Sequence, residues 1–280
     1  MAEKTQRATA EKLRALHATG LLILPNAWDA GSAAVIALAG AQAIATTSGG
    51  IAWSLGRRDG QRLTRAEMVE RIREIVAAVT IPVTADIEGG YGPGPEDVAL
   101  TVEAVIAAGA VGVNIEDSRA PGGPLFDTAE QAARIHAARA AAASAGLPGL
   151  FINARTDVFL YRIGVSEARL DDVLARSCAY AQAGADSLFA PGLTDLRVIT
   201  ELAGSSPLPV NVMAGPGAPL VAELAAAGVR RVSIGTAMAQ AAYTLAKRAA
   251  AELFTTGSYA ALEAALDFGT IDGLFAGIPE

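Results

Sequence analysis

Eight short apolar runs recur along the 280-residue chain, with helical patterns between them. The runs begin at residues 21, 43, 81, 111, 150, 187, 208 and 231. The intervening patterns, such as residues 64–79 and 94–109, carry acidic residues early and apolar residues at spacings of three and four. This alternation is typical of parallel strands joined by crossover helices. Eight such units predict a (β/α)8 barrel. A doubly wound open sheet is the rival fold, because periodicity alone does not establish closure.

Residues 1–280 are predicted to form a single barrel domain, because no low-complexity linker divides the chain. After the last apolar run a helical pattern reaches about Leu253, and residues 256–280 remain as a C-terminal helical extension. Its residues Leu262, Leu266 and Phe268 fall on one helical face. Since eight helices already ring the barrel, we expect this face to pack on a neighbouring subunit or, alternatively, on its own barrel.

The charge balance excludes two classes of partner. The formal net charge is -7 and the basic residues form no run, so no nucleic acid and no anionic membrane is expected as a partner. Residues 30–56 are uncharged, but polar breaks predict helix, turn, strand and loop there rather than a membrane span. The single cysteine, Cys178, cannot form an internal disulfide, and the N-terminus lacks the apolar core of a signal peptide. We therefore expect a cytoplasmic protein.

Polar residues gather at one end of the predicted strands. They are Thr46, Thr47, Ser48, Gly49 and Gly50 after the second strand, Asp86 and Glu88 after the third, Asn114, Glu116 and Asp117 after the fourth, Asn153, Arg155 and Asp157 after the fifth, and Asn211 after the seventh. Catalytic groups of (β/α)8 barrels sit at the carboxyl ends of the strands. Closure of the barrel would therefore bring these side chains together at one mouth.

Asp86 and Glu88 lie two residues apart, so their side chains should emerge on the same side of the strand. Carboxylates at close range raise one another's pKa unless a cation compensates them. The two histidines, His17 and His136, are not at strand ends, so zinc is disfavoured and oxygen ligands indicate Mg²⁺ or Mn²⁺. The pattern predicts a divalent cation site, with a salt-bridged strand tip as the alternative.

The segment TTSGG, residues 46–50, predicts a glycine-rich loop whose backbone N–H groups could cradle an anion, or else only a tight turn. Arg155 could grip a carboxylate in bidentate fashion, or could merely neutralise Asp157. Together the two features predict a small, doubly charged organic acid as the substrate.

Missing residues exclude two barrel chemistries. The three lysines, Lys4, Lys12 and Lys247, lie in terminal helices, so no Schiff-base lysine stands on a barrel strand. A glycosidase with acids after strands four and seven is excluded because Asn211 ends the seventh strand.

Four motifs, TTSGG, ADIEGGYG, VNIEDS and INARTD, resemble those of the isocitrate lyase and phosphoenolpyruvate mutase superfamily, in the same order from about Pro25 to Gly235. The resemblance implies a (β/α)8 barrel that binds Mg²⁺ and 2-oxo or enol acids. It also implies dimers or tetramers that exchange a C-terminal helix. The second acid of the strand-three pair is a glutamate, Glu88, and in this the chain resembles the mutase-like branch of the superfamily.

The resemblance also implies residue roles. Ser48, Gly49 and Gly50 match the loop that holds the substrate carboxylate and oxo oxygen, and Asp59 matches an aspartate near metal and substrate. The assignments are catalysis by Asp59, Glu116 and Arg155, substrate binding by Thr47, Ser48, Gly49, Gly50, Arg155 and Asn211, and metal binding by Asp86, Glu88 and Glu116.

Two departures limit the reaction. The lyases carry a KKCGH or KRCGH loop after strand four whose cysteine is the acid/base, but residues 118–139 here have neither Cys nor His near the loop tip. Cys178 is predicted to be a core residue of a helix instead. After Asn211, where the lyases have a substrate-contacting glutamate, this chain reads VMAGPG.

The leading expectation is a Mg²⁺-assisted lyase that cleaves a carbon–carbon bond of a small 2-oxo or 2-hydroxy dicarboxylic acid through an enolate. Phosphorus–carbon bond chemistry, as in phosphoenolpyruvate mutase and phosphonopyruvate hydrolase, is the second. A catalytically silent 2-oxo acid binding protein is the third. The proton donor stays open between water and a residue of the loop 118–128.

Overall fold

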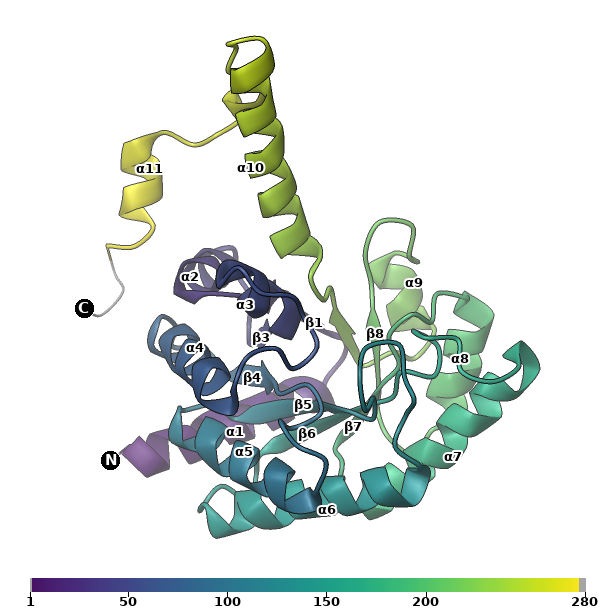
Figure 1. Ribbon diagram of the computed structural model, residues 1–280. Helices are drawn as coiled ribbons and strands as arrows, with labels where there is room; N and C mark the ends of the chain where they lie inside the picture. The colour runs from purple at the N-terminus through teal and green to yellow at the C-terminus, as the bar shows by residue number, and fades with distance from the viewer. Residues whose placement is uncertain (1, 277–280) are drawn as a thin grey trace.

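The computed structural model of the protein describes residues 2–276, in which parallel strands curve into a barrel ringed by helices (Figure 1). The strands are β1 (Leu22–Leu24), β2 (Asn26–Ala27), β3 (Ile44–Thr46), β4 (Val83–Asp86), β5 (Gly112–Glu116), β6 (Phe151–Arg155), β7 (Ser187–Phe189), β8 (Val210–Met213) and β9 (Arg231–Ser233). The α-helices are α1 (Ala2–Ala18), α2 (Ala30–Leu38), α3 (Ser48–Ser54), α4 (Arg65–Ala77), α5 (Pro95–Ala107), α6 (Thr128–Ser144), α7 (Arg169–Gln182), α8 (Leu196–Ser205), α9 (Val221–Ala226), α10 (Ala237–Thr255) and α11 (Phe268–Gly273). Two short 3₁₀ helices are η1 (Ser166–Ala168) and η2 (Ala260–Leu262).

The sheet order is β1-β9-β8-β7-β6-β5-β4-β3-β2, and all neighbouring strands are parallel. The two ends of this order, β1 and β2, are separated in the chain only by Pro25, so the sheet returns to its start as a nearly closed barrel. The predicted barrel is confirmed and the open sheet is excluded. All eight predicted strands are present. The additional strand β2 arises because Pro25, which has no N–H to donate, divides the first apolar run.

Local sequence signals account for the start of several helices. At α4 the Thr64 side chain accepts a hydrogen bond from the Glu67 N–H at 3.2 Å, and Glu67 accepts one from the Thr64 N–H at 2.8 Å. This reciprocal pair is a capping box. The helix then places Met68, Ile72 and Ile75 in the buried core.

Helix α1 lies under the amino ends of the strands and forms the floor of the barrel. Its Leu13 is fully buried, and a side-chain carbon added at Gly112 of β5 would come within 3.0 Å of Leu13 Cδ2. His17 stacks on Phe151 of β6 with ring centroids 3.8 Å apart. The floor leaves the carboxyl ends of the strands as the place where a site can open.

The uncharged stretch 30–56 folds as α2, β3 and α3, and no helix within residues 2–276 is long and apolar enough to cross a membrane. The predicted glycine-rich loop is wrong, because the chain enters α3 directly at Ser48. The predicted core position of Cys178 is also wrong. This residue is exposed on α7, while its neighbours Ser177 and Tyr180 face the interior.

The C-terminal segment leaves the barrel. Figure 1 shows α10 projecting from the strand ends and α11 standing apart from the barrel. Leu262 ends η2 and Phe268 begins α11, so the predicted single helical face does not form. Phe254 is 90% exposed and Phe268 is 83% exposed. The described part of the extension, residues 256–276, therefore does not cover its own barrel, and residues 277–280 lie outside the described range.

Candidate active site

The carboxyl ends of the strands open into a cavity of about 220 Å³. Its lining includes Asn26, Thr46, Thr47, Ser48, Gly49, Asp59, Thr84, Asp86, Asn114, Arg155, Phe189, Met213, Arg231 and Ser233. A second hollow shares Ser48, Asp59 and Arg155 with the first and adds Glu88, Glu116 and Tyr161. The predicted mouth is therefore a pair of connected hollows, an inner one in the barrel and an outer one above it.

Asp86, the last residue of β4, is held by its neighbours on both sides. Its Oδ2 accepts a hydrogen bond from the Ser48 N–H at 3.1 Å, and its Oδ1 accepts one from Asn114 Nδ2 at 3.1 Å. Asn114 in turn accepts from Asn153 Nδ2 at 3.0 Å. These contacts fix the carboxylate at the boundary between the barrel interior and the first turn of α3.

Glu88 follows on a backbone with φ of +49°, in the left-handed region that side chains rarely adopt. It is 4% exposed, and its carboxylate accepts hydrogen bonds from the Tyr91 hydroxyl at 2.9 Å and from the Gln61 N–H. Burial, with the charges of Asp86 and Asp59, raises the pKa of Glu88 to about 7. The strained turn thus holds a carboxyl group among other acids.

Asp59 reaches the site from the loop between α3 and α4. Its carboxylate lies so close to Gly49 that an added Cβ there would meet Asp59 Oδ2 at 3.0 Å. Burial and then the charge of Asp86 raise the pKa of Asp59, and the Gly60 N–H and Arg155 oppose this shift. The structure therefore brings Asp59 beside the metal and substrate candidates named from the sequence.

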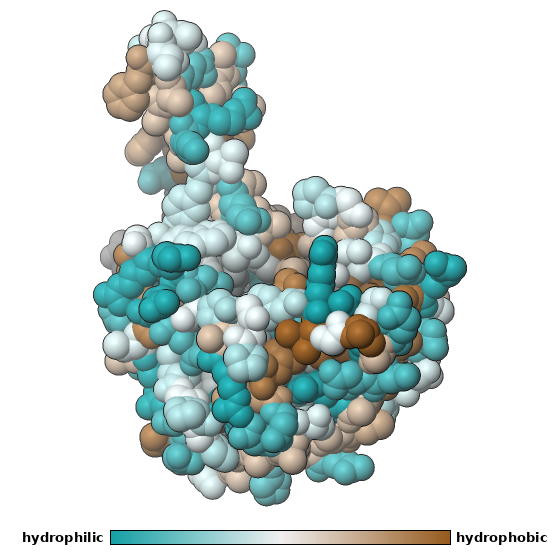
Figure 2. All heavy atoms as spheres, turned by 45° about the vertical axis from the view of Figure 1, so that its right-hand side comes forward, coloured by the Kyte–Doolittle hydropathy of each residue, from teal (hydrophilic) through white to brown (hydrophobic). Residues whose placement is uncertain are grey.

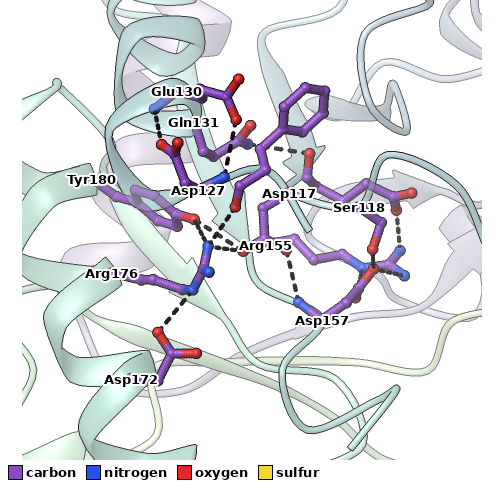
Figure 3. A network of polar contacts seen from close by, with 12 residues as sticks. Asp117, Ser118, Asp127, Glu130, Gln131, Arg155, Asp157, Asp172, Arg176 and Tyr180 are labelled. Atoms are coloured by element: carbon purple, nitrogen blue, oxygen red, sulfur yellow. Dashed lines mark hydrogen bonds and ion pairs between the residues drawn. The ribbon is translucent and has the colours of Figure 1, made fainter. Parts of the chain in front are cut away.

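Arg155, at the end of β6, is shared between two carboxylates. Its Nε and Nη2 donate to Asp157 at 2.6 and 3.1 Å (Figure 3). Its Nη1 lies 2.8 Å from Glu116 Oε2. Burial raises the pKa of Glu116 well above its usual value, with Arg155 opposing the shift. The alternative that Arg155 neutralises Asp157 is thus realised, while the guanidinium also lines both hollows.

Two predicted members of the mouth face elsewhere. Asp117 accepts hydrogen bonds from Arg176 Nη1 at 3.0 Å, from the Tyr180 hydroxyl at 2.9 Å and from the Asp157 N–H at 3.0 Å (Figure 3). Asp117 and Asp157 are both fully buried behind the barrel wall. Asp117 points away because successive side chains of a strand alternate, so Glu116 takes the inward position.

The first turn of α3 forms one wall of the cavity. Thr47, Ser48 and Gly49 line it, whereas Gly50 packs behind it, where an added Cβ would meet Thr47 Cγ2 and Trp28 Cβ, each at 2.7 Å. Asn211 lies deeper in the barrel and accepts a hydrogen bond from Ser233 Oγ at 3.1 Å. It is fully buried and is not among the residues that line the cavity.

The loop 118–128 lies over the outer hollow. Pro121 lines this hollow, and an added Cβ at Gly60 would meet Pro121 Cγ at 2.3 Å. Arg119 turns outward to pair with Glu130 and lies over the Phe126 ring, 4.1 Å from its centroid. The loop tip therefore supplies shape rather than a charged group to the site.

The donor set fits a divalent cation. Within the part of the chain that the structure describes, no three His, Cys, Asp or Glu side chains already form a ligand group. Mg²⁺ commonly keeps several waters and needs only one or two protein carboxylates. Burial raises the pKa values of Asp59, Glu88 and Glu116, and a bound cation would stabilise the ionised forms of these carboxyl groups. Asp86 could hold an ion directly, with Glu88 and Glu116 acting directly or through water.

One residue of the cavity, Arg231, was missed in the analysis of the sequence. It opens β9, and its side chain enters the barrel interior, where it is 3% exposed. An arginine at the head of an apolar run, directly after Arg230, is easily taken for the polar end of the preceding helix. The signal was its spacing from Ser233, since alternate residues of a strand face the same side.

Comparison with known proteins agrees with the fold. The family model described as phosphoenolpyruvate phosphomutase matches residues 13–254. The chain belongs to this family. An uncharacterized protein of Mycobacterium tuberculosis is 37% identical over 222 residues, which cover 79% of this chain and 80% of that protein. A crystal structure from Burkholderia cenocepacia J2315, described there only by class as a lyase/mutase, has 41% identity and a TM-score of 0.90 over 97% of this chain and 98% of its own.

Other relatives carry different chemistries. A 2-methylisocitrate lyase of Bacillus subtilis is 31% identical over 216 residues, covering 74% of this chain and 68% of that enzyme. The crystal structure of a phosphonopyruvate hydrolase complexed with oxalate and Mg²⁺ is 26% identical, with a TM-score of 0.82 over 95% of this chain and 94% of its own. The predicted membership of the isocitrate lyase and phosphoenolpyruvate mutase superfamily is confirmed. Lyase and phosphorus–carbon reactions both occur within it.

Proposed function

We propose that this member of the phosphoenolpyruvate phosphomutase family is a Mg²⁺- or Mn²⁺-dependent lyase that cleaves a carbon–carbon bond of a small 2-oxo or 2-hydroxy dicarboxylic acid through an enolate. One observation carries the proposal. Asp59, Asp86 and Glu116, from three different segments, converge with Arg155 on one mouth. Carboxylates gathered in this way suit a divalent cation, and the guanidinium beside them suits an acidic substrate.

Each residue has a distinct task in the proposed reaction. Asp86, with Glu88 and Glu116, would hold the divalent ion. When bound, the ion would draw off the negative charge that develops on the substrate's oxo oxygen. The backbone of Ser48 and Gly49 would contact the substrate carboxylate at the wall of the cavity.

The charged groups around the substrate would orient it and move protons. Arg155 forms ion pairs with both Glu116 and Asp157. Its remaining N–H groups would donate hydrogen bonds to the substrate. Asp59 has a pKa raised by burial and by Asp86, and its carboxylate beside Gly49 could take up or return a proton. Arg155 and Asp59 thus complete the set of groups that would touch the reacting acid.

The loop 118–128 turns no cation toward the site, and this favours carbon–carbon over phosphorus–carbon chemistry, although Arg57, which pairs with Glu67, and Arg58 also line the outer hollow. A migrating phosphoryl group needs cations beside it. Arg119, the only basic residue of the loop 118–128, pairs instead with Glu130. Phosphorus NMR on phosphonopyruvate separates the two reactions, because only phosphorus–carbon cleavage changes the signal.

The experiment for the proposal replaces Asp86 by asparagine, which preserves shape and removes charge. The affinity for oxalate in the presence of Mg²⁺, measured by calorimetry, should fall by at least about 100-fold. The turnover rate across a panel of short oxo and hydroxy acids should fall by a similar factor. Asp171→Asn is the matched control, since this aspartate is exposed on α7. Retention of both Mg²⁺ dependence and turnover in Asp86→Asn would refute the scheme.

A silent binding protein makes a different prediction from the same site. Oxaloacetate with Mg²⁺ would then raise the unfolding temperature of the wild-type protein while no acid in the panel is consumed. Turnover of any member of the panel excludes this alternative.

We also propose that the protein is a homodimer or homotetramer in which the C-terminal segment packs on a neighbouring subunit. The support is the exposed apolar surface of α10, α11 and the segment between them, which includes Phe254, Tyr259, Leu266 and Phe268. Figure 2 also shows apolar side chains on the projecting segment.

A further inference from the structure

Arg231 is a buried arginine without a partner. Within residues 2–276, its Nε and Nη1 are both inaccessible to solvent and have no hydrogen-bond acceptor. The other arginines buried to a similar degree are satisfied. Arg134 donates to Gln131 and to backbone carbonyls of the segment 89–94, and Arg176 pairs with Asp117 at 3.0 Å. An unpaired buried charge is strongly unfavourable. The third nitrogen of the guanidinium, Nη2, is not among these enclosed atoms, so an anion that meets Nη2 from the cavity would compensate the charge and account for its retention.

The side chain of Arg231 points into the cavity already described. Its Cα is paired with Leu22 of β1 and Asn211 of β8, and Arg231 and Ser233, two residues apart, both line the cavity. Arg155 and Ser48 line the same cavity. Two guanidinium groups therefore line the same small cavity, that of Arg155 at the mouth and that of Arg231 in the interior.

The surroundings of Arg231 leave its charge largely uncompensated. Burial lowers its pKa to about 9, and Asp86 is the one acid whose charge opposes this shift. On the floor side, His17 is buried as well, and its pKa is lowered partly by the charge of Arg231. If Asp86 binds a divalent ion, it compensates Arg231 still less. The interior end of the cavity therefore attracts an anion.

We propose that Arg231 binds the second carboxylate of the substrate and selects short 2-oxo dicarboxylic acids over monocarboxylic ones. The inference rests on the proposed function, because it assumes that the 2-oxo end of the acid occupies the mouth beside Asp86 and Arg155. The volume of about 220 Å³ lies below the usual range of ligand pockets, which suits a short diacid. The guanidinium offers the carboxylate charge-assisted hydrogen bonds in a desolvated site.

The test compares a monocarboxylic with a dicarboxylic 2-oxo acid, each titrated by calorimetry with saturating Mg²⁺. They are pyruvate and 3,3-difluorooxaloacetate, an unreactive diacid that carries a second carboxylate and two fluorine atoms on C3. In the wild-type protein the diacid should bind more tightly. In Arg231→Met its dissociation constant should rise by about 10- to 100-fold, while that of pyruvate should change by less than about twofold. Arg230→Met removes the adjacent exposed arginine and should leave both constants unchanged.

A second variant and a stability measurement guard against trivial loss of fold. Arg231→Lys keeps the charge but loses the planar fork, so it should show the same selective loss at smaller size. The ligand-free Arg231→Met variant should not unfold at a lower temperature than the wild type, because methionine removes an unpaired buried charge. A marked drop in unfolding temperature of both variants would make Arg231 a structural residue and overturn the proposal.

The outcomes also separate this inference from the proposed function. If wild-type protein binds both ligands and Arg231→Met weakens them equally or not at all, the role of Arg231 is wrong while the oxo acid site stands. If wild-type protein binds neither ligand with Mg²⁺, the proposed function fails and the assignment of Arg231 fails with it.

Discussion

His17, on the floor of the barrel, couples the protein's stability to pH. One ring nitrogen, Nδ1, lies 2.8 Å from the Leu13 carbonyl, and Nε2 is buried with no partner within the described residues. Burial, aided by the charge of Arg231, lowers the pKa of His17 from 6.5 to about 4. Between these values the unfolded chain binds a proton that the folded protein does not, so stability must fall as pH falls.

Replacing His17 by phenylalanine should remove this acid sensitivity. The ring would keep its stacking on Phe151, but the proton-uptake difference would disappear. Wild-type protein should lose on the order of 3 kcal/mol of unfolding free energy between pH 6.5 and 4 through this group, and His17→Phe should lose correspondingly less. Urea unfolding at a series of pH values measures the difference. His136→Gln, an exposed histidine on α6, is the control. Equal acid slopes in wild type and His17→Phe would contradict the assignment.

Strand alternation decided which site residues could be predicted from the sequence. It correctly brought Asp86 and Glu116 to the mouth, because inward positions recur every second residue. Applied strictly, it would also have turned Asp117 away from the mouth. The role of Arg231 was not predicted, because it depends on guanidinium nitrogens that have no hydrogen-bond acceptor. The lack of an acceptor can be seen only in the three-dimensional structure.

At the scale of single elements, α3 is held by packing rather than by propensity. Glycine disfavours helices, which is why the sequence predicted a loop at Gly49 and Gly50. In the structure both positions are helical, and they must be glycine because a side chain there would collide with its neighbours. A Cβ at Gly49 would meet Thr236 Cγ2 at 2.9 Å, and a Cβ at Gly50 would meet Trp28 Cβ at 2.7 Å. Tertiary contacts of this kind could not be inferred from local sequence.

Gly50→Ala should therefore destabilise the protein although alanine is the better helix former. Both Thr47 and Trp28 stand too close to the added methyl group, and overpacking of this kind costs about 1–3 kcal/mol. The nearest atom to an added Cβ at Gly31 of α2 is 3.7 Å away, so Gly31→Ala should instead stabilise the protein by about 0.5–1 kcal/mol. If α3 is held by these contacts, chemical unfolding should show a lower free energy of unfolding for Gly50→Ala and a higher one for Gly31→Ala than for the wild type. A stabilised Gly50→Ala would show that the helix has room to shift.

At the scale of the whole molecule, the barrel was predictable and the placement of the C-terminal segment was not. Eight strand and helix units favour the closed sheet, because closure leaves no strand edge unpaired. The extension carries only an apolar pattern, and such a pattern does not say which surface covers it. In the structure residues 256–276 do not pack on their own barrel (Figure 1). A neighbouring subunit is therefore the proposed surface that covers them.

Two exposed phenylalanines provide the test of that assembly. Phe254 and Phe268 are 90% and 83% exposed, and burying such side chains between subunits stabilises association by about 1.5–3 kcal/mol each. The double variant Phe254→Ser and Phe268→Ser should therefore shift the molar mass from that of an oligomer toward 28.4 kDa. Light scattering after size-exclusion chromatography measures the mass across a dilution series.

Val165→Ser is the matched control, because this valine is 66% exposed in the loop before η1, away from α10 and α11. It should leave the molar mass at the wild-type value. The Phe variants should retain binding of oxalate with Mg²⁺ if each barrel mouth is complete on its own, since none of residues 256–276 lines either hollow. A wild-type protein that is monomeric at every concentration would mean that the apolar segment has another partner. An oligomer unaffected by loss of both phenylalanines would place the subunit contact elsewhere on the barrel.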